Sequence, residues 1–285
     1  IAFIGVAANV INVIVFHRQG LKTTVNIGLT GLAVSDLCSL LTLPWYIPMA
    51  KTFPKGAGLN IFYHDAQQLT VGFPHACFTR TTAWLTVLLT AERCLCVALP
   101  LKFKRTMTPR RVRLAVCFVY FIMFVSLLPE YTTAYLDWNW DSRANVSVLG
   151  IFFAPNRQQT EGISFLLYGI YALVAFPAVV LSTSVMVARL KQSSVKRKMM
   201  NSSIVGVGAV SRRDQKAINL VIAVACVFII TYIPMVLICL QAFIEPSATP
   251  ANNGLVHVVV SAGLVFDAIN SSVNIITYYT MSSKY

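Results

Sequence analysis

Seven apolar stretches, separated by short polar segments, follow one another along the chain. They cover roughly residues 1–16, 25–49, 69–97, 112–128, 163–190, 216–244 and 255–280. All but the first are long enough to cross a bilayer as an α-helix, which needs about 17–25 residues. The strands of a membrane barrel would be shorter and would alternate apolar and polar residues. The pattern therefore predicts an all-α membrane protein, a bundle of seven transmembrane helices that occupies residues 1–285 as a single domain.

The composition also favours a membrane protein. Of the 285 residues, 56% are hydrophobic and 12% are charged, and the mean hydropathy is +0.68, which is high for a soluble domain. The net charge of +13 could indicate a nucleic-acid-binding protein, but most Lys and Arg residues lie on one side of the predicted bundle. Positive residues gather on the cytoplasmic side of membrane proteins. We therefore expect a multi-pass plasma-membrane protein with its N-terminus outside, its C-terminus inside and no nucleic-acid partner.

The chain ends and the connecting segments carry further predictions. The chain begins at Ile1 inside an apolar stretch and stops at Tyr285 soon after another, so we expect both tails to be missing. Residues 130–159 form the longest predicted outer loop. They contain Asn145 in an Asn-Val-Ser triplet, a predicted glycosylation site that agrees with the orientation, although such triplets also occur by chance. Residues 191–215 are basic and Ser-rich and predict an inner loop.

The cysteines give no sign of a metal site or a disulfide framework. All seven lie within or at the edges of apolar stretches, and none has CxxC spacing. We therefore expect buried thiols.

One face of the third apolar stretch is polar over its whole length. At about 100° per residue, five of its polar side chains fall within about 40° of one another. They are His75, Thr79, Thr82, Thr86 and Arg93. Ionisable side chains inside a membrane are costly, so they indicate function unless they form structural pairs. The stripe predicts either a functional site or hydrogen bonds between helices.

The seventh stretch carries a second polar stripe. It consists of Asp267, Asn270, Ser271, Asn274 and Tyr278. Asp36 in the second stretch and Asn9 in the first add polar groups to the predicted interior. Hydrogen bonding between helices is the alternative for the Asn and Ser side chains, whereas an aspartate inside the membrane favours a functional role.

The two arginines of the third stretch carry separate predictions. Arg80 lies about 140° from the polar stripe, so it either pairs with an acidic group, binds an anionic ligand or extends its charge to the membrane interface. Glu92 and Arg93 form a charged pair where the apolar stretch meets a basic segment. Such a pair belongs at an aqueous border and requires a specific partner.

Six short motifs occur in order along these stretches. They are Asn9, an LAxxD motif at residues 32–37, Glu92-Arg93-Cys94 as a D/E-R-Y motif, Pro177, residues 228–234 as an FxxCWxP motif and residues 270–278 as an NSxxNPxxY motif. Each is weak alone, but together they resemble the rhodopsin-like (class A) G-protein-coupled receptors over nearly the whole chain. The resemblance implies a receptor that binds an extracellular ligand and activates a heterotrimeric G protein.

Several positions depart from the pattern of that family. Ile275 replaces the NPxxY proline, Tyr232 the usual tryptophan, Cys94 the tyrosine of the D/E-R-Y motif and Val185 the helix-five tyrosine, and Tyr120 lies near the place of the helix-four tryptophan. Gln68 stands where the outer cysteine is expected, so the usual outer disulfide is expected to be absent. Together with residues 92–102, this absence resembles divergent invertebrate receptors of the molluscan chemosensory or neuropeptide-like orphan kind.

The resemblance places the ligand among the third, fifth, sixth and seventh helices. The residues expected to bind it are His75, Thr79, Arg80, Tyr232 and Asp267. His75 and Asp267 could also pair with each other, structurally or in a pH-sensitive contact. Ala268 stands where an opsin has its lysine, and His75 where amine receptors have an aspartate. Retinal and amine ligands are therefore not expected, and no cofactor is implied.

The resemblance also implies a switch on the inner side. The residues expected to control activation are Glu92, Arg93, Asp214, Pro234, Asn274 and Tyr278. At rest, Arg93 would be held by Glu92 and by Asp214 at the start of the sixth helix, which would swing about Pro234 to admit the G protein. A further set, Asp36, Thr82, Asn270 and Asn274, resembles the sodium site of the family.

Two other protein classes share some of these features. A transporter or channel also lines its path with polar and acidic residues, and it is the alternative, although the sequence has no inverted repeats or interrupted helices in matching halves. An enzyme is not expected. The histidines have no metal-binding spacing, and the sequence has no nucleophile or phosphate-loop motif.

Overall fold

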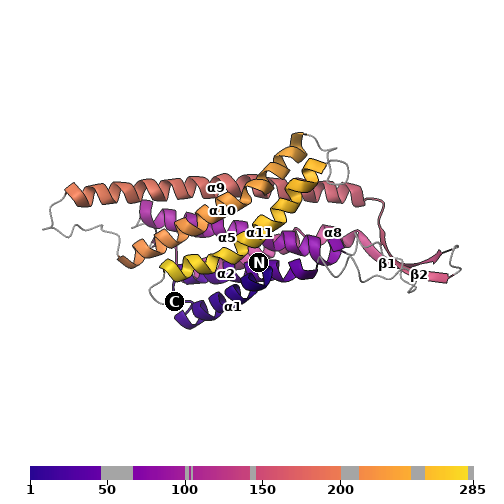
Figure 1. The fold of residues 1–285 in the computed structure, drawn as a ribbon, viewed down its shortest axis with the longest axis horizontal. Helices are drawn as coiled ribbons and strands as arrows, with labels where there is room; N and C mark the ends of the chain where they lie inside the picture. The colour runs from indigo at the N-terminus through magenta and orange to yellow at the C-terminus, as the bar shows by residue number, and fades with distance from the viewer. Residues whose placement is uncertain are drawn as a thin grey trace.

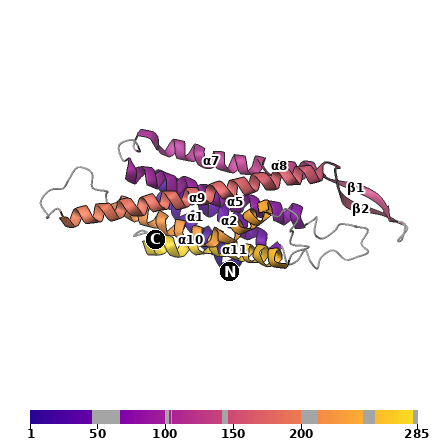
Figure 2. The same ribbon diagram turned by 90° about the horizontal axis from the view of Figure 1, so that it is seen from above.

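The computed structural model describes residues 1–45, 67–99, 103, 105–141, 146–199, 212–244 and 254–281. Its helices are α1 (Ala2–Gln19), α2 (Thr24–Thr42), the 3₁₀ turn η1 (Leu43–Trp45), the π-helical η2 (Gln68–Gly72), α5 (Phe73–Ala98), α7 (Pro109–Val125), α8 (Leu128–Thr132), α9 (Arg157–Met199), α10 (Arg212–Ile244) and α11 (Gly254–Met281). The strands are β1 (Ala134–Asp141) and β2 (Val146–Phe153). The long helices lie side by side in an elongated bundle, and the hairpin projects from one end (Figures 1 and 2).

Helix α5 is central in the bundle. It packs against α2, α7, α9 and α10, and α11 packs against α10, α1 and α2. Six segments are long and apolar enough to cross a membrane, namely α1, α2, η2 with α5, α7 with α8, α9 and α10. Helix α11 is the remaining long helix. The seven-helix membrane bundle expected from the sequence is therefore confirmed.

Short polar sequences set the ends of several helices. Thr23 caps α2 by accepting a hydrogen bond from the backbone N–H of Asn26, and Thr108 caps α7 in the same way through the N–H of Arg111. Helix α1 ends at Gly20, whose φ of 84° lies in the left-handed region that favours glycine. These local signals place the helix ends before any packing is considered.

The bundle is apolar on its surface, and its interior combines hydrophobic clusters with buried polar side chains. Large apolar side chains such as Phe118, Leu181 and Ile230 are exposed on its surface, as a lipid environment permits. The expectation of buried thiols is wrong for two cysteines, because Cys117 and Cys226 are exposed among these lipid-facing side chains. All seven cysteines are free.

The predicted outer loop of residues 130–159 is wrong in its secondary structure. It contains the short helix α8 and two antiparallel strands that pair from Ala134 with Phe153 to Asp141 with Val146. Aromatic and β-branched residues are frequent in both strands, and Tyr135 stacks on Phe152 with 6.2 Å between ring centroids. The sequence between two membrane helices can therefore be predicted as a loop and still form a hairpin when its apolar residues are divided between two strands.

Helices α9 and α10 are longer than the apolar pattern predicted. Helix α9 begins at Arg157 and continues to Met199, so the first part of the predicted inner loop of residues 191–215 is helical. Residues 191–199 include several Lys, Gln, Arg and Met residues, which are good helix formers, so the helix extends beyond its apolar part. Residues 46–49, predicted as the end of the second helix, lie outside the described residues.

The close approach of α2 and α5 depends on Gly28. A Cβ atom at this position would lie 2.5 Å from Cδ2 of Leu89, whereas a Cβ at Gly162 would meet nothing within 4 Å. We expect Gly28→Leu to destabilise the bundle by about 1–3 kcal/mol, as overpacking does. The measurement is the apparent melting temperature of the purified receptor, with Gly162→Leu as the control. Equal melting temperatures for the two variants would contradict this role of Gly28.

Candidate functional site

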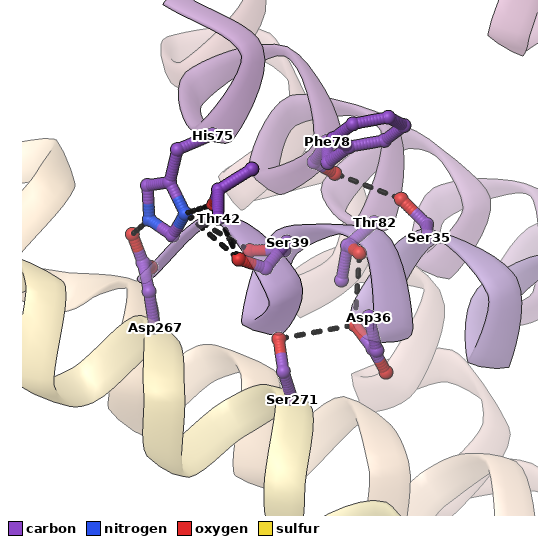
Figure 3. Close-up of polar contacts among 9 residues, drawn as sticks. All are labelled: Ser35, Asp36, Ser39, Thr42, His75, Phe78, Thr82, Asp267 and Ser271. Atoms are coloured by element: carbon purple, nitrogen blue, oxygen red, sulfur yellow. Dashed lines mark hydrogen bonds and ion pairs between the residues drawn. The ribbon is translucent and has the colours of Figure 1, made fainter. Parts of the chain in front are cut away.

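The carboxylate of Asp36 is shared by three helices. Thr82 of α5 donates a hydrogen bond to its Oδ1 at 2.9 Å, and from α11 Ser271 donates to Oδ1 at 3.2 Å and Asn274 to Oδ2 at 2.7 Å. Figure 3 shows Thr82 and Ser271 reaching the carboxylate of Asp36 from two different helices. Asp36 is fully buried. Three of the four residues predicted for a cation site therefore meet, and Ser271 contacts Asp36 from the position next to the predicted Asn270.

Helix α1 is tied to the same region by Asn9. Its Nδ2 donates to the backbone oxygen of Ser271 at 2.6 Å and to that of Gly5 at 3.0 Å, and Asn12 donates to its Oδ1 at 3.3 Å. These bonds place α1 against the part of α11 that carries the contacts to Asp36. The polar pattern placed Asn9 in the interior but assigned no role to Asn12.

His75 lies between Asp267 and two hydroxyl groups of α2. Its Nε2 is 3.8 Å from Oδ2 of Asp267, and its Nδ1 is 3.3 Å from Oγ of Ser39 and 3.0 Å from Oγ1 of Thr42 (Figure 3). The two polar stripes therefore face each other, as the sequence suggested. Ser39 and Thr42 were missed, although they follow Asp36 at intervals of three residues, a spacing that places side chains on neighbouring positions of a helix face.

Arg80 points into the bundle. Its side chain is buried, and its guanidinium carbon lies 3.4 Å from the ring centroid of Tyr168 in α9. This placement excludes the alternative in which Arg80 extends its charge outward. On α10, buried Tyr232 stacks on Phe228 with 4.5 Å between ring centroids.

Several of the buried polar atoms without hydrogen-bond partners belong to the predicted ligand residues, and others lie elsewhere in the bundle, for example on Glu92 and Arg93. Within the described part of the chain, they include Nε2 of His75, Oγ1 of Thr79, Nε and Nη2 of Arg80 and the hydroxyl of Tyr232. Buried polar groups in native proteins are nearly always paired, so each such atom requires an explanation. A group that enters from outside the chain, a ligand or ordered water, would complete these atoms.

The inner end of α5 holds Arg93 in a closed arrangement. Arg93 forms an ion pair with Glu92, donates from Nη2 to Oγ1 of Thr24 at 3.1 Å, and has its guanidinium carbon 5.4 Å from the ring centroid of Phe103. Thr24 and Phe103 were not singled out from the sequence. Both arginine and glutamate are buried, so the pair is shielded from solvent.

The side chains of three other predicted residues lie outside the described part of the structure. Asp214 lies near the start of α10 and Tyr278 near the end of α11, but their side chains are outside the described part of the structure. Asn145 lies entirely outside the described residues. Pro234 is inside α10, where the switch hypothesis requires it.

The contacts to Asp36 predict unequal roles for two adjacent residues of α11. Ser271→Ala removes a hydrogen bond to a buried carboxylate, so it should cost about 1–3 kcal/mol of stability. Asn270→Ala should cost less, because Ser271 makes the contact. The apparent melting temperatures of the two purified variants test this order. A larger loss for Asn270→Ala would show that the contact geometry at Asp36 is wrong.

Comparison with known proteins agrees with this architecture. The family model described as 7 transmembrane receptor (rhodopsin family) matches residues 8–278. The chain is 26% identical over 312 residues to the "Galanin-like G-protein coupled receptor npr-9" of Caenorhabditis elegans. This alignment covers 100% of this chain and 69% of that protein. It is 21% identical over 304 residues to the "FMRFamide receptor" of Drosophila melanogaster, and this alignment covers 100% of this chain and 51% of that receptor. It is 23% identical over 246 residues to the "Sex peptide receptor-related protein 2" of Caenorhabditis elegans, and this alignment covers 80% of this chain and 54% of that protein. The chain belongs to the rhodopsin family of seven-transmembrane receptors.

Proposed function

We propose that this G-protein-coupled receptor of the plasma membrane is activated by an extracellular peptide. The observation that carries the proposal is that buried polar atoms of His75, Thr79, Arg80 and Tyr232 have no hydrogen-bond partner in the part of the chain that the structure describes. A ligand that reaches them would bridge α5 and α10, and Asp267 adds a contact from α11. The names of the relatives favour a peptide over a small chemosensory molecule.

The orientation of the bundle follows from its charges. The hairpin and α8 lie at the end that carries few basic residues, and we assign this end to the extracellular side. The opposite end carries Arg93 and the basic parts of α9 and α10 and would face the G protein. This orientation places the N-terminus outside and the C-terminus inside, and it gives the ligand and the G protein separate ends of the same helices.

Activation would consist of releasing Arg93. At rest the guanidinium is held by Glu92 and Thr24, and Asp214 would add a second acidic partner from α10. Movement of α10 about Pro234 would separate these groups and open the inner end to the G protein, with Tyr278 of α11 joining the active state. A ligand can favour this change only through contacts that differ between the two states. Contacts to Tyr232 on α10 and Asp267 on α11 meet that condition, because both helices would move relative to α5.

The cluster around Asp36 would hold a sodium ion in the resting state. Asp36, Thr82 and Asn274 are in contact, and Asn270 lies one residue from Ser271 on the same helix. Carboxylate and hydroxyl oxygens are ligands that hard cations prefer. Agonist binding that depends on sodium, compared with choline at equal ionic strength, would support this assignment.

The ligand role of Asp267 can be tested once a peptide agonist is known. A screen of invertebrate neuropeptides with cyclic AMP and calcium readouts should identify one. Asp267→Asn should then weaken its potency about 10- to 100-fold, because a hydrogen bond to a charged group contributes about 1.5–3 kcal/mol. Ser272→Ala is the control, since its hydroxyl donates to Ala268 within α11. Unchanged potency in Asp267→Asn at normal surface expression would leave His75 and Asp267 as a structural pair.

The proposed lock on Arg93 predicts basal signalling. Asp214→Asn removes the second acidic partner and should raise basal G-protein activity, because the resting state loses a contact that the active state lacks. Gln215→Ala, which changes an uncharged neighbour whose side chain contacts Asn219, is the control. The measurement is basal cyclic AMP and calcium signalling, normalised to receptor at the cell surface. Equal or lower basal activity in Asp214→Asn would argue against the lock.

A further inference from the structure

The neighbours of His75 fix which of its two ring nitrogens carries a proton. Its Nδ1 lies 3.0 Å from Oγ1 of Thr42 and 3.2 Å from the backbone oxygen of Ser39. A backbone oxygen can only accept a hydrogen bond. The hydroxyl of Thr42 already donates its proton to that same backbone oxygen at 2.6 Å, so toward His75 it can only accept as well. Nδ1 therefore carries a proton in this arrangement.

The other ring nitrogen faces a carboxylate. Nε2 is 3.8 Å from Oδ2 of Asp267 and has no hydrogen-bond partner among the described residues. With the proton on Nδ1, a neutral imidazole presents a lone pair at Nε2, and two acceptors cannot share a hydrogen bond. A second proton on the ring supplies the missing donor. Nε2–H would then donate to Asp267, and the contact would shorten by roughly 1 Å to the length of a charge-assisted hydrogen bond.

This protonation would join three helices. Helix α5 carries the imidazole, α2 the acceptors of Nδ1–H and α11 the acceptor of Nε2–H. Figure 3 shows His75 between Asp267 on one side and Ser39 and Thr42 on the other. Helix α11 packs mainly against α10, α1 and α2, so the new bond would add a link between α5 and α11.

The pair is placed where extracellular protons can reach it. The side chain of Asp267 is 17% exposed, whereas that of His75 is 4% exposed. Ser39 and Thr42 follow Asp36 toward the end of α2 that the charges assign to the extracellular side. Histidine is the side-chain type that ordinarily changes its charge between about pH 5 and 8. A change of extracellular pH can therefore act on this contact.

Other titratable or charged side chains lie on the surrounding helices. Near the level of the pair, those with described side chains are Asp36 and Cys38 of α2, Cys77 and Arg80 of α5, Tyr120 of α7, Tyr168 and Tyr171 of α9, and Tyr232 and Cys239 of α10. The guanidinium of Arg80 lies over the ring of Tyr168. Asp36 is the other acid of this set, and its carboxylate accepts hydrogen bonds from α5 and α11. A test must therefore separate proton uptake at His75 from proton uptake at Asp36.

We propose that His75 and Asp267 form a proton-operated latch between α5 and α11. A proton taken up from the extracellular side by Nε2 of His75 closes the latch, and its loss opens the latch. Closure withdraws Nε2 and the carboxylate of Asp267 from ligand binding, and it stabilises the arrangement in which Arg93 is paired with Glu92. Extracellular acid therefore opposes activation. Because the latch lies among the proposed ligand residues, this inference rests on the proposed function.

The first test requires no ligand. The apparent melting temperature of the purified receptor is measured for the wild type and for His75→Gln, whose amide does not titrate. The stabilisation by a closed latch is present at low pH and lost as the pH rises. From about pH 7.5 to about pH 5.5, we therefore expect the wild type to gain about 3 °C or more relative to His75→Gln.

Two further variants complete this test. His17→Gln removes an exposed histidine near the inner end of α1 and should follow the wild type. Asp267→Asn replaces the charged acceptor by a neutral one and should reduce the gain at low pH, because a bond to a charged group is stronger. It also serves if His75→Gln cannot be purified in a folded form.

The second test uses the peptide agonist from the screen, applied to cells at two extracellular pH values. On acidification from about pH 7.5 to about pH 6.0, its potency should fall at least about threefold in the wild type and in His17→Gln. In His75→Gln the fall should be less than about 1.5-fold, because the titrating group is gone. Receptor at the cell surface is measured in each case, and the first test decides if His75→Gln does not respond to the agonist.

The outcomes separate this inference from the proposed function. A gain at low pH that is the same in the wild type and in His75→Gln would overturn the latch and assign the proton to another group, such as Asp36. A wild type that loses stability relative to His75→Gln at low pH would overturn it too. Both results would leave the peptide receptor intact. No response to any peptide from a receptor present at the surface would contradict the proposed function and the regulatory role of the latch, whereas the melting temperatures would still show whether the bond between His75 and Asp267 forms.

Discussion

The hydrogen bonds to Asp36 are the constraint on which the bundle depends. One buried carboxylate accepts from α5 and twice from α11, while its own backbone belongs to α2. Asn9 adds α1 through the backbone of Ser271. Separating these helices near Asp36 would cost the packing between them and would also leave a buried carboxylate without its hydrogen bonds, which is costly. In a bilayer, where lipid tails offer no hydrophobic drive for association, such polar contacts and close packing hold helices together.

Satisfied and unsatisfied polar groups divide the interior into two regions. Around Asp36 three side chains donate to the two carboxylate oxygens, although Oδ1 of Asn274 has no hydrogen-bond partner among the described residues. Toward the hairpin end, atoms of Thr79, Arg80, Glu130 and Tyr232 are buried without hydrogen-bond partners among the described residues. The first region joins α2, α5 and α11 through hydrogen bonds within the chain, and the second contains buried polar atoms for which the described residues supply no partner. This difference is the physical reason for placing ligand binding toward the hairpin end of the bundle and helix association around Asp36.

Helical periodicity was enough to predict a large part of the fold and of the site. The seven helices and the meeting of His75 with Asp267 depend on which residues share a face of a helix, whereas the meeting of Asp36 with Thr82 and Asn274 was expected from the resemblance of these residues to the sodium site of the receptor family. Choosing between Ser271 and Asn270 requires the rotation of α11 to within a residue, which periodicity does not supply. The pairing of β1 with β2 is a contact between segments, and the residues between two membrane helices were taken for a loop. Glu130 was assigned to that loop because nothing local distinguishes a buried acid at a helix end from a solvated one.

The hairpin is attached to the bundle by both of its ends, at α8 and at α9. A two-stranded ribbon has little stability of its own, so its position depends on the two helices that hold its base. With about 3.3 Å per residue, strands of this length reach roughly 26 Å, and a tilt of about 10° at the base would move the tip by about 4–5 Å. A hairpin held in this way would act as a lever arm. Small rearrangements of α9 against α8 around Arg80, Tyr168 and Glu130 would be magnified at the tip, and contacts made there would act back on the helices with the same mechanical advantage.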